Sequence, residues 1–218
     1  MALADYIGKY WAGAEVMYGI IIAMTFTSVL RDYPVVFDFL LNKVIYSALM
    51  CCIAWGIADG MFYVWERSYL IRQENTIIQS SKSPQQNASA LSLIADQLDD
   101  TILRNISQEN RQKLYESLVQ YLSTVDIREK VSARETISIL LGTFLRSAAA
   151  GLVIVIPFFV IPDVAKALIL SNTMGIILLF CVGYLRALER DFFSKVINGI
   201  AASFIGIIIA VITIILGG

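Results

Sequence analysis

The chain of 218 residues has a hydrophobic fraction of 57%, a charged fraction of only 16%, a net charge of -1 and no histidine. Soluble globular proteins carry roughly 25% charged residues, so this composition argues against that class. The net charge provides no basic surface for nucleic acid, and the lack of histidine removes the commonest metal ligand.

The apolar residues gather in blocks of about 20 residues, the length that a helix needs to cross a hydrocarbon core about 30 Å thick. The first block is too long for the apolar part of a cleavable signal peptide, which is about 7–15 residues. The sequence therefore predicts an all-α integral membrane protein with five transmembrane helices, at 11–30, 44–65, 143–162, 165–187 and 197–216.

Residues 66–142 differ in kind from these blocks. From Glu66 to Glu135 there are nine Lys or Arg and ten Asp or Glu residues. After a polar linker, apolar residues recur at helical spacing in two runs: Leu91, Ile94, Leu98 and Ile102, then Leu114, Leu118 and Leu122. A capping-box pattern at 132–135 predicts a helix start that leads into the third block. We therefore expect transmembrane helices 1 and 2 in 1–65, a small helical cytoplasmic insert in 66–142, and helices 3–5 in 143–218.

The orientation follows from Lys and Arg residues near the block ends, since these favour the cytoplasmic side. One side carries eight of them and the other three: Lys9, Arg67, Arg72, Arg134, Arg146, Arg186, Arg190 and Lys195, against Arg31, Lys43 and Lys166. The N-terminus and the insert are therefore expected in the cytoplasm, and the C-terminus outside or in a lumen. An odd number of helices and a small amphipathic insert leave apolar surface for a second copy, so we expect a homodimer in the lipid bilayer.

Two acids lie inside apolar blocks, Glu15 in the first and Asp59 in the second. A charge in the membrane costs a few kcal/mol unless it is paired or hydrated, so such residues mark functional sites. At about 1.5 Å rise per residue, both carboxylates fall at similar depth near the cytoplasmic ends of helices joined by a short loop. There they could share a cation or relay a proton. Arg146 falls toward the same side, and in a structural alternative it pairs with Asp59 while Glu15 reaches the membrane surface.

Two further sets of residues are candidate cation ligands. Met17 and Met61 lie near the acids, and thioethers suit soft cations, although methionine also fills space in helices. The insert offers acidic helix faces that could capture a cytoplasmic metal or be merely solvated: Asp96, Asp99, Asp100, Glu109 and Glu116. The sequence contains no phosphate-binding loop, nucleophile elbow or zinc motif, so we expect neither enzyme activity nor a resident cofactor.

The order of two helices, a charged helical insert and three helices resembles the vacuolar iron transporter family. The segments that carry the resemblance are 53–67, 151–157, 182–186 and 199–202. The resemblance implies a homodimer that moves ferrous iron or manganese out of the cytosol in exchange for protons, with Glu15 and Asp59 binding the metal and relaying protons. The same match places Trp55 and Ser47 where the family carries a metal-binding Met and a Glu. A non-transporting membrane scaffold or regulator with the same fold is therefore the alternative.

Overall fold

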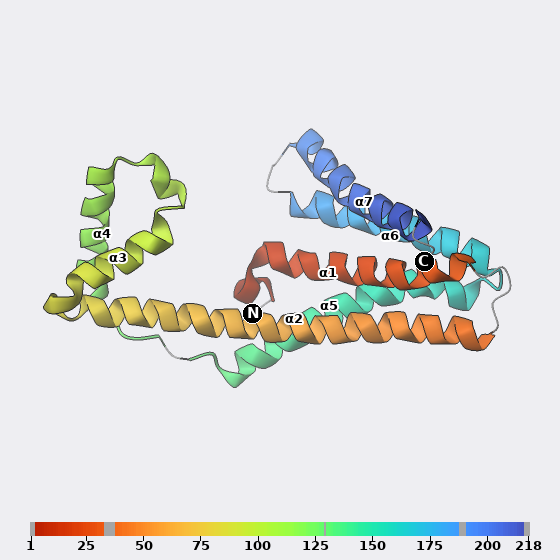
Figure 1. Cartoon of the computed structure of the whole chain (residues 1–218), viewed down its shortest axis with the longest axis horizontal. Helices are drawn as coiled ribbons and strands as arrows, with labels where there is room; N and C mark the ends of the chain where they lie inside the picture. The colour runs from red at the N-terminus through yellow and green to blue at the C-terminus, as the bar shows by residue number, and fades with distance from the viewer. Residues whose placement is uncertain (1–2, 33–37, 129, 188–190, 216–218) are drawn as a thin grey trace. The chain divides into compact units, whose positions relative to one another are not determined.

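The computed structural model describes residues 3–32, 38–128, 130–187 and 191–215. Its regular structure is entirely helical in these residues (Figure 1), which confirms the all-α prediction for the described part of the chain. The helices are α1 (Ala4–Ser28), α2 (Asp38–Ser81), α3 (Asn87–Leu98), α4 (Gln108–Leu122), α5 (Ala133–Val160), α6 (Val164–Arg186) and α7 (Phe192–Ile215), with short 3₁₀ turns η1 (Val29–Asp32), η2 (Pro84–Gln86) and η3 (Ile102–Asn105).

The chain divides into two compact units. The first comprises residues 1–63 and 134–218, and the second comprises residues 64–133. Helix α2 contributes to both, because the boundary falls directly after Tyr63. The sequence placed the boundaries after residues 65 and 142. The second boundary lies earlier in the structure because α5 begins at Ala133, so its first turns belong to the first unit.

Four helices of the described chain are long and apolar enough to cross a membrane: Trp11–Arg31, Phe39–Ser81, α5 and α6. They indicate a multi-pass membrane protein, because only a bilayer accommodates so many long apolar helices with exposed apolar side chains. Helix α7 differs, since its apolar stretch among the described side chains covers only Phe192–Ile208. The described residues thus supply four candidate crossings where the sequence predicted five.

Small residues bring α1, α2 and α5 together in the first unit. Gly19 of α1 lies so close to α5 that a Cβ atom there would collide with the carbonyl oxygen of Ser147. Cys52 Sγ of α2 donates a hydrogen bond to the Gly19 carbonyl oxygen at 3.4 Å, and Ser147 Oγ donates to the Cys52 carbonyl oxygen at 2.9 Å. Such close backbone approach is how helices associate in a membrane, where apolar burial supplies little driving force.

The second unit has an apolar core of its own. Ile77 near the end of α2 is buried together with Ala90 and Ile94 of α3 and with Tyr115 and Val119 of α4. This core buries one apolar face of each short helix, which is how an amphipathic helix gains most of its stability.

The residues that are buried in this unit differ in part from the apolar runs predicted from the sequence. Ile102 lies beyond the end of α3, in η3, and is 82% exposed, while Leu114 is also exposed. The face of α4 that is buried carries Tyr115 and Val119. Tyr115 thus lies in the core, one position after the exposed Leu114.

Candidate functional site

Glu15 is the one charged residue that is fully enclosed in the described part of the chain. It lies on α1 within a candidate membrane span and has 0% of its surface exposed. Tyr63 Oη of α2 donates a hydrogen bond of 2.8 Å to Glu15 Oε1. Among the described residues, the second oxygen, Oε2, has no hydrogen-bond partner. A buried polar atom without a partner costs about 1–3 kcal/mol, and more when charged, so Oε2 is suited to take a proton or a cation.

Asp59 and Arg146 are the other charged groups near this carboxylate. Asp59 is half-buried, lies one helical turn before Tyr63 on α2, and shares a helix face with it. The charges of Asp59 and of Arg146 on α5 both act on the Glu15 carboxylate. Tyr63 is therefore the residue that contacts the Glu15 carboxylate, while Asp59 and Arg146 act on it through their charge alone.

Arg146 does not pair with either acid. No salt bridge joins it to Glu15 or Asp59 among the described residues, and its Nη1 donates instead to the Gly142 carbonyl oxygen of its own helix at 3.1 Å. The structural alternative in which Asp59 pairs with Arg146 is thus not formed in the structure. When Glu15 and Asp59 are both ionised, their two negative charges exceed the single positive charge of Arg146 by one.

The position of Asp59 along the helix bundle is fixed by Gly56 and Gly60, which lie on either side of it in α2. A Cβ atom at Gly56 would lie 2.8 Å from the Phe144 Cα atom of α5, and one at Gly60 would lie 3.1 Å from the Leu140 Cα atom. The glycine spacing therefore seats α2 directly on the backbone of α5. Neither Asp59 nor Tyr63 can slide along the bundle while this contact is intact.

The two methionines are not brought to the acids together. Met17 Sδ accepts a hydrogen bond from Arg186 Nη1 at 3.0 Å. Met61 is 63% exposed on the outward side of α2. It is two residues from both Asp59 and Tyr63, and at about 100° per residue it points to roughly the opposite face of the helix. Within one chain, Met61 therefore does not join the site as the sequence analysis expected.

The positions that the family resemblance matched to metal ligands also face outward. Trp55 is 50% exposed, and Ser47 is exposed as well. Their outward direction means that neither substitution removes a side chain from the neighbourhood of Glu15. The available carboxylate oxygen at the site is instead Oε2 of Glu15.

Tyr63 is the functional residue that sequence reasoning missed. Its ring packs against Trp11 of α1, with centroids 6.2 Å apart and planes inclined by 52°. The available signal was its position four residues after Asp59, which places both side chains on one face of α2. A buried tyrosine hydroxyl usually finds a polar partner, and in this bundle the nearby acid of α1 provides it.

The acidic residues of the second unit have local partners. Asp99 accepts hydrogen bonds from Tyr115 Oη at 2.7 Å and from Arg111 Nη1 at 3.0 Å, and the bond to Asp99 raises the pKa of the Tyr115 hydroxyl. Glu109 pairs with Lys113 at 2.6 Å, and Glu116 accepts from Gln112 at 3.1 Å.

Asp96 and Asp100, the remaining acids of that set, are exposed. In the part of the chain that the structure describes, no three Cys, Asp or Glu side chains gather closely enough to hold a metal ion. The predicted metal-capturing face of the insert is therefore not assembled in a single chain. The physical reason is that neighbouring side chains already engage Asp99, Glu109 and Glu116, while Asp96 and Asp100 are exposed.

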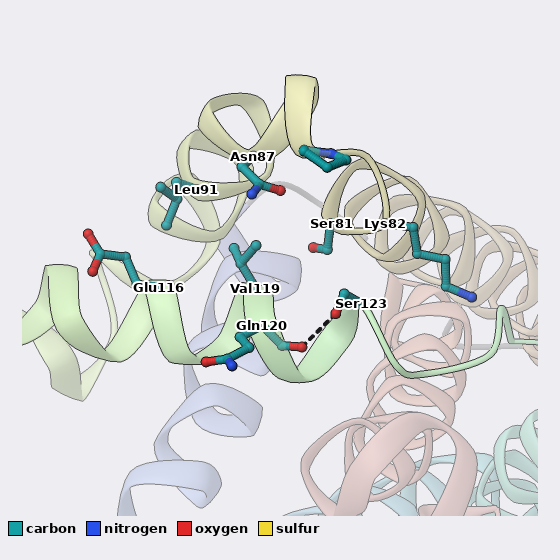
Figure 2. A pocket seen from close by; sticks show the side chains of 9 residues that line it. Ser81, Lys82, Asn87, Leu91, Glu116, Val119, Gln120 and Ser123 are labelled. Carbon is teal, nitrogen blue, oxygen red and sulfur yellow. Dashed lines mark hydrogen bonds between the residues drawn. The ribbon is translucent and has the colours of Figure 1, made fainter.

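A pocket of about 410 Å³ lies in the second unit (Figure 2). It is lined by the end of α2, the start of α3 and the second half of α4. Its lining is mixed in charge, with Lys82 and Glu116 among the residues that form it. The hydroxyl of Ser81 donates to the Ile77 carbonyl oxygen, and that of Ser123 donates to the Gln120 carbonyl oxygen, as the dashed line in Figure 2 shows. Both hydroxyls are thus engaged by their own helices, and we assign no ligand to this pocket.

No protein-family model, curated protein or solved structure matches this chain. The function proposed below therefore rests on the chemistry of Glu15 and its neighbours.

Proposed function

We propose that this chain is a membrane transporter for a divalent metal ion, iron or manganese, which it moves in exchange for protons. The observation that carries the proposal is the Glu15 carboxyl group. It is fully buried in a helix suited to cross the membrane, holds Tyr63 through one oxygen, and has no partner among the described residues for the other. A bare negative charge there is unfavourable, so the group is stabilised by a proton or by a cation. The replacement of one by the other is the elementary step of cation–proton exchange.

The donor atoms favour a hard cation. The carboxylates of Glu15 and Asp59 offer oxygen, which suits Mn²⁺, whereas the Met17 sulfur is engaged by Arg186. A small divalent ion can be held by one or two carboxylates while it keeps several waters. Two carboxylates with one arginine are therefore a workable site for a partly hydrated ion that passes through the membrane.

The proposal includes five crossings, with α7 as the fifth, and a homodimer. Five crossings place the N-terminus and the C-terminus on opposite sides of the membrane. The Lys and Arg distribution then places the N-terminus and the second unit in the cytoplasm. Apolar side chains such as Trp55 and Phe204 are exposed on α2 and α7, and a second copy can cover part of them. Mass measurement in nanodiscs should find two copies per particle, and a monomer would contradict the dimer.

The test is Mn²⁺ uptake into proteoliposomes with a pH gradient across the membrane. We expect the unaltered protein to take up Mn²⁺ and to move protons in the opposite direction. Glu15→Gln should lower uptake by at least about tenfold, because the only change is loss of the charge that exchanges proton for cation. Asp59→Asn should weaken uptake in the same direction. Glu66→Gln, at an exposed position of α2, is the matched control and should leave uptake unchanged.

The second candidate is a membrane scaffold without transport. The observation in its favour is that no three potential ligand side chains of the described residues converge on a metal. In that case the Glu15–Tyr63 hydrogen bond serves only to stabilise the packing of α1 against α2. The unaltered protein would then show no Mn²⁺-dependent uptake or proton movement, while Glu15→Gln would still lower its thermal stability.

A further inference from the structure

We propose that Tyr63 determines which cation the Glu15 site accepts, because its hydrogen bond engages one lone pair of Oε1 and makes that oxygen a poorer ligand than Oε2. The inference rests on the proposed function and adds to it a selection by ionic size: small six-coordinate cations are accepted and Ca²⁺ is disfavoured. Tyr63 acts through Glu15 in this role and is therefore a specificity-determining residue rather than a primary ligand.

The orientation of the tyrosine is set independently of the acid. Its ring is packed against Trp11, and the helix that carries it is seated on α5 through Gly56 and Gly60. The phenol therefore reaches Glu15 from a fixed direction and donates its proton to Oε1 at 2.8 Å. Oε2 is left as the oxygen without a partner among the described residues.

This hydrogen bond is one of several contacts that hold α1 against α2. Cys52 Sγ already donates to the Gly19 carbonyl oxygen, and Ser147 Oγ donates to the Cys52 carbonyl oxygen, about three helical turns from Tyr63. The close contact of Gly19 with Ser147 adds a backbone contact between α1 and α5. Several groups besides the phenol thus hold the helices together, and the Tyr63 hydroxyl also acts directly on the carboxylate.

The effect follows from the way in which cations use carboxylates. Ca²⁺ takes six to eight oxygen ligands and readily accepts both oxygens of one carboxylate, whereas smaller divalent ions prefer near-octahedral coordination and retain water. In a carboxylate with one oxygen bonded to a phenol, that oxygen keeps a lone pair but is the weaker ligand of the two. Binding through the other oxygen alone is then favoured, which suits the smaller ion. Without the phenol hydroxyl, both oxygens become accessible to one ion, and Ca²⁺ gains a ligand that the smaller ion does not require.

The experiment measures the Ca²⁺ concentration that halves Mn²⁺ uptake into proteoliposomes. It compares the unaltered protein with Tyr63→Phe, which removes only the hydroxyl. We expect half-inhibition of Tyr63→Phe at a Ca²⁺ concentration about tenfold lower, the order of effect of one hydrogen bond to a charged group. Tyr46→Phe is the matched control, because Tyr46 is 59% exposed on the same helix, and its Ca²⁺ inhibition should equal that of the unaltered protein.

The outcomes separate the two proposals. Mn²⁺ uptake with the same Ca²⁺ sensitivity in the unaltered protein and in Tyr63→Phe would overturn the selectivity role while leaving transport in place. No Mn²⁺ uptake by the unaltered protein would overturn the transport function and the selectivity role with it. If Tyr63→Phe does not yield a folded protein, Glu15→Asp provides a second test. Its side chain is one methylene shorter, so its carboxylate no longer reaches the Tyr63 hydroxyl. It should shift Ca²⁺ sensitivity in the same direction, and an unchanged sensitivity there would also contradict the proposal.

Discussion

Gly19 of α1 lies directly against the carbonyl oxygen of Ser147 in α5, with no room for a Cβ atom between them. The contact joins the helix that carries Glu15 to the helix that carries Arg146. Since the obstacle is backbone rather than a flexible side chain, the two helices must move apart if Gly19 gains a methyl group. Any such movement changes the distance between Glu15 and the groups on α5.

Gly19→Ala should therefore destabilise the first unit by about 1–2 kcal/mol, because the overpacking cost exceeds the gain in helix propensity. Thermal unfolding in detergent measures the change. Gly142→Ala is the matched control on α5, since its new Cβ would meet only the Leu3 side chain. Equal unfolding temperatures for the two variants would show that the Gly19 contact does not contribute to the stability of the first unit.

Glu15 should react with an apolar carbodiimide, a reagent that modifies carboxyl groups within the membrane. Its full burial in a membrane helix favours the neutral acid that such reagents attack. Mass spectrometry of the labelled protein should locate the adduct on Glu15, and Glu15→Gln should remove it. Millimolar Mn²⁺ should reduce the labelling if the cation replaces the proton at this group. Labelling that Mn²⁺ leaves unchanged would separate Glu15 from cation binding.

Asp163 should stabilise the start of α6 in a pH-dependent manner. It accepts hydrogen bonds from the Lys166 backbone N–H at 3.1 Å and lies 3.3 Å from Lys166 Nζ. The backbone donor first and the lysine side chain second hold the pKa of Asp163 below its usual range. A carboxylate with a lowered folded-state pKa adds stability above its unfolded pKa, near 3.8, and that stability is lost as the pH falls through the folded value.

Asp163→Asn, which retains a capping side chain but not the charge, should unfold about 1–2 °C below the unaltered protein at pH 7. The difference should shrink as the pH is lowered below about 4. A difference that stays constant between pH 7 and pH 3 would mean that the charge of Asp163 does not contribute.

The number of crossings can be measured with single cysteines at positions 83 and 217. Cys51, Cys52 and Cys181 carry free thiols and must first be replaced. With five crossings, a membrane-impermeant maleimide added to sealed proteoliposomes of a single orientation should label only one of Gly217→Cys and Ser83→Cys. Labelling of both or of neither would place the two positions on one side and require an even number of crossings between them.

Part of the site could be predicted from the sequence. Glu15 and Asp59 stand out because each is an acid within an apolar block, and helix rise alone places them at similar depth. The partner of Glu15 could not be predicted in this way. Tyr63, Met17 and Met61 all lie near the acids along the sequence. In the structure Tyr63 bonds to Glu15, whereas Met17 accepts a hydrogen bond from Arg186 and Met61 is exposed.

The sequence by itself determined that the chain is built from long apolar helices that suit a membrane, because the length and composition of each apolar run suffice for that conclusion. It also determined that a charged helical segment separates the second helix from the third. Only the tertiary structure decided which side chain meets which. A helix that is apolar on all sides has no amphipathic stripe, so its rotation about its own axis cannot be read from hydropathy. In α2 that rotation is set by the contacts of Gly56 and Gly60 with α5, which direct Tyr63 toward Glu15 and leave Met61 on the outer surface.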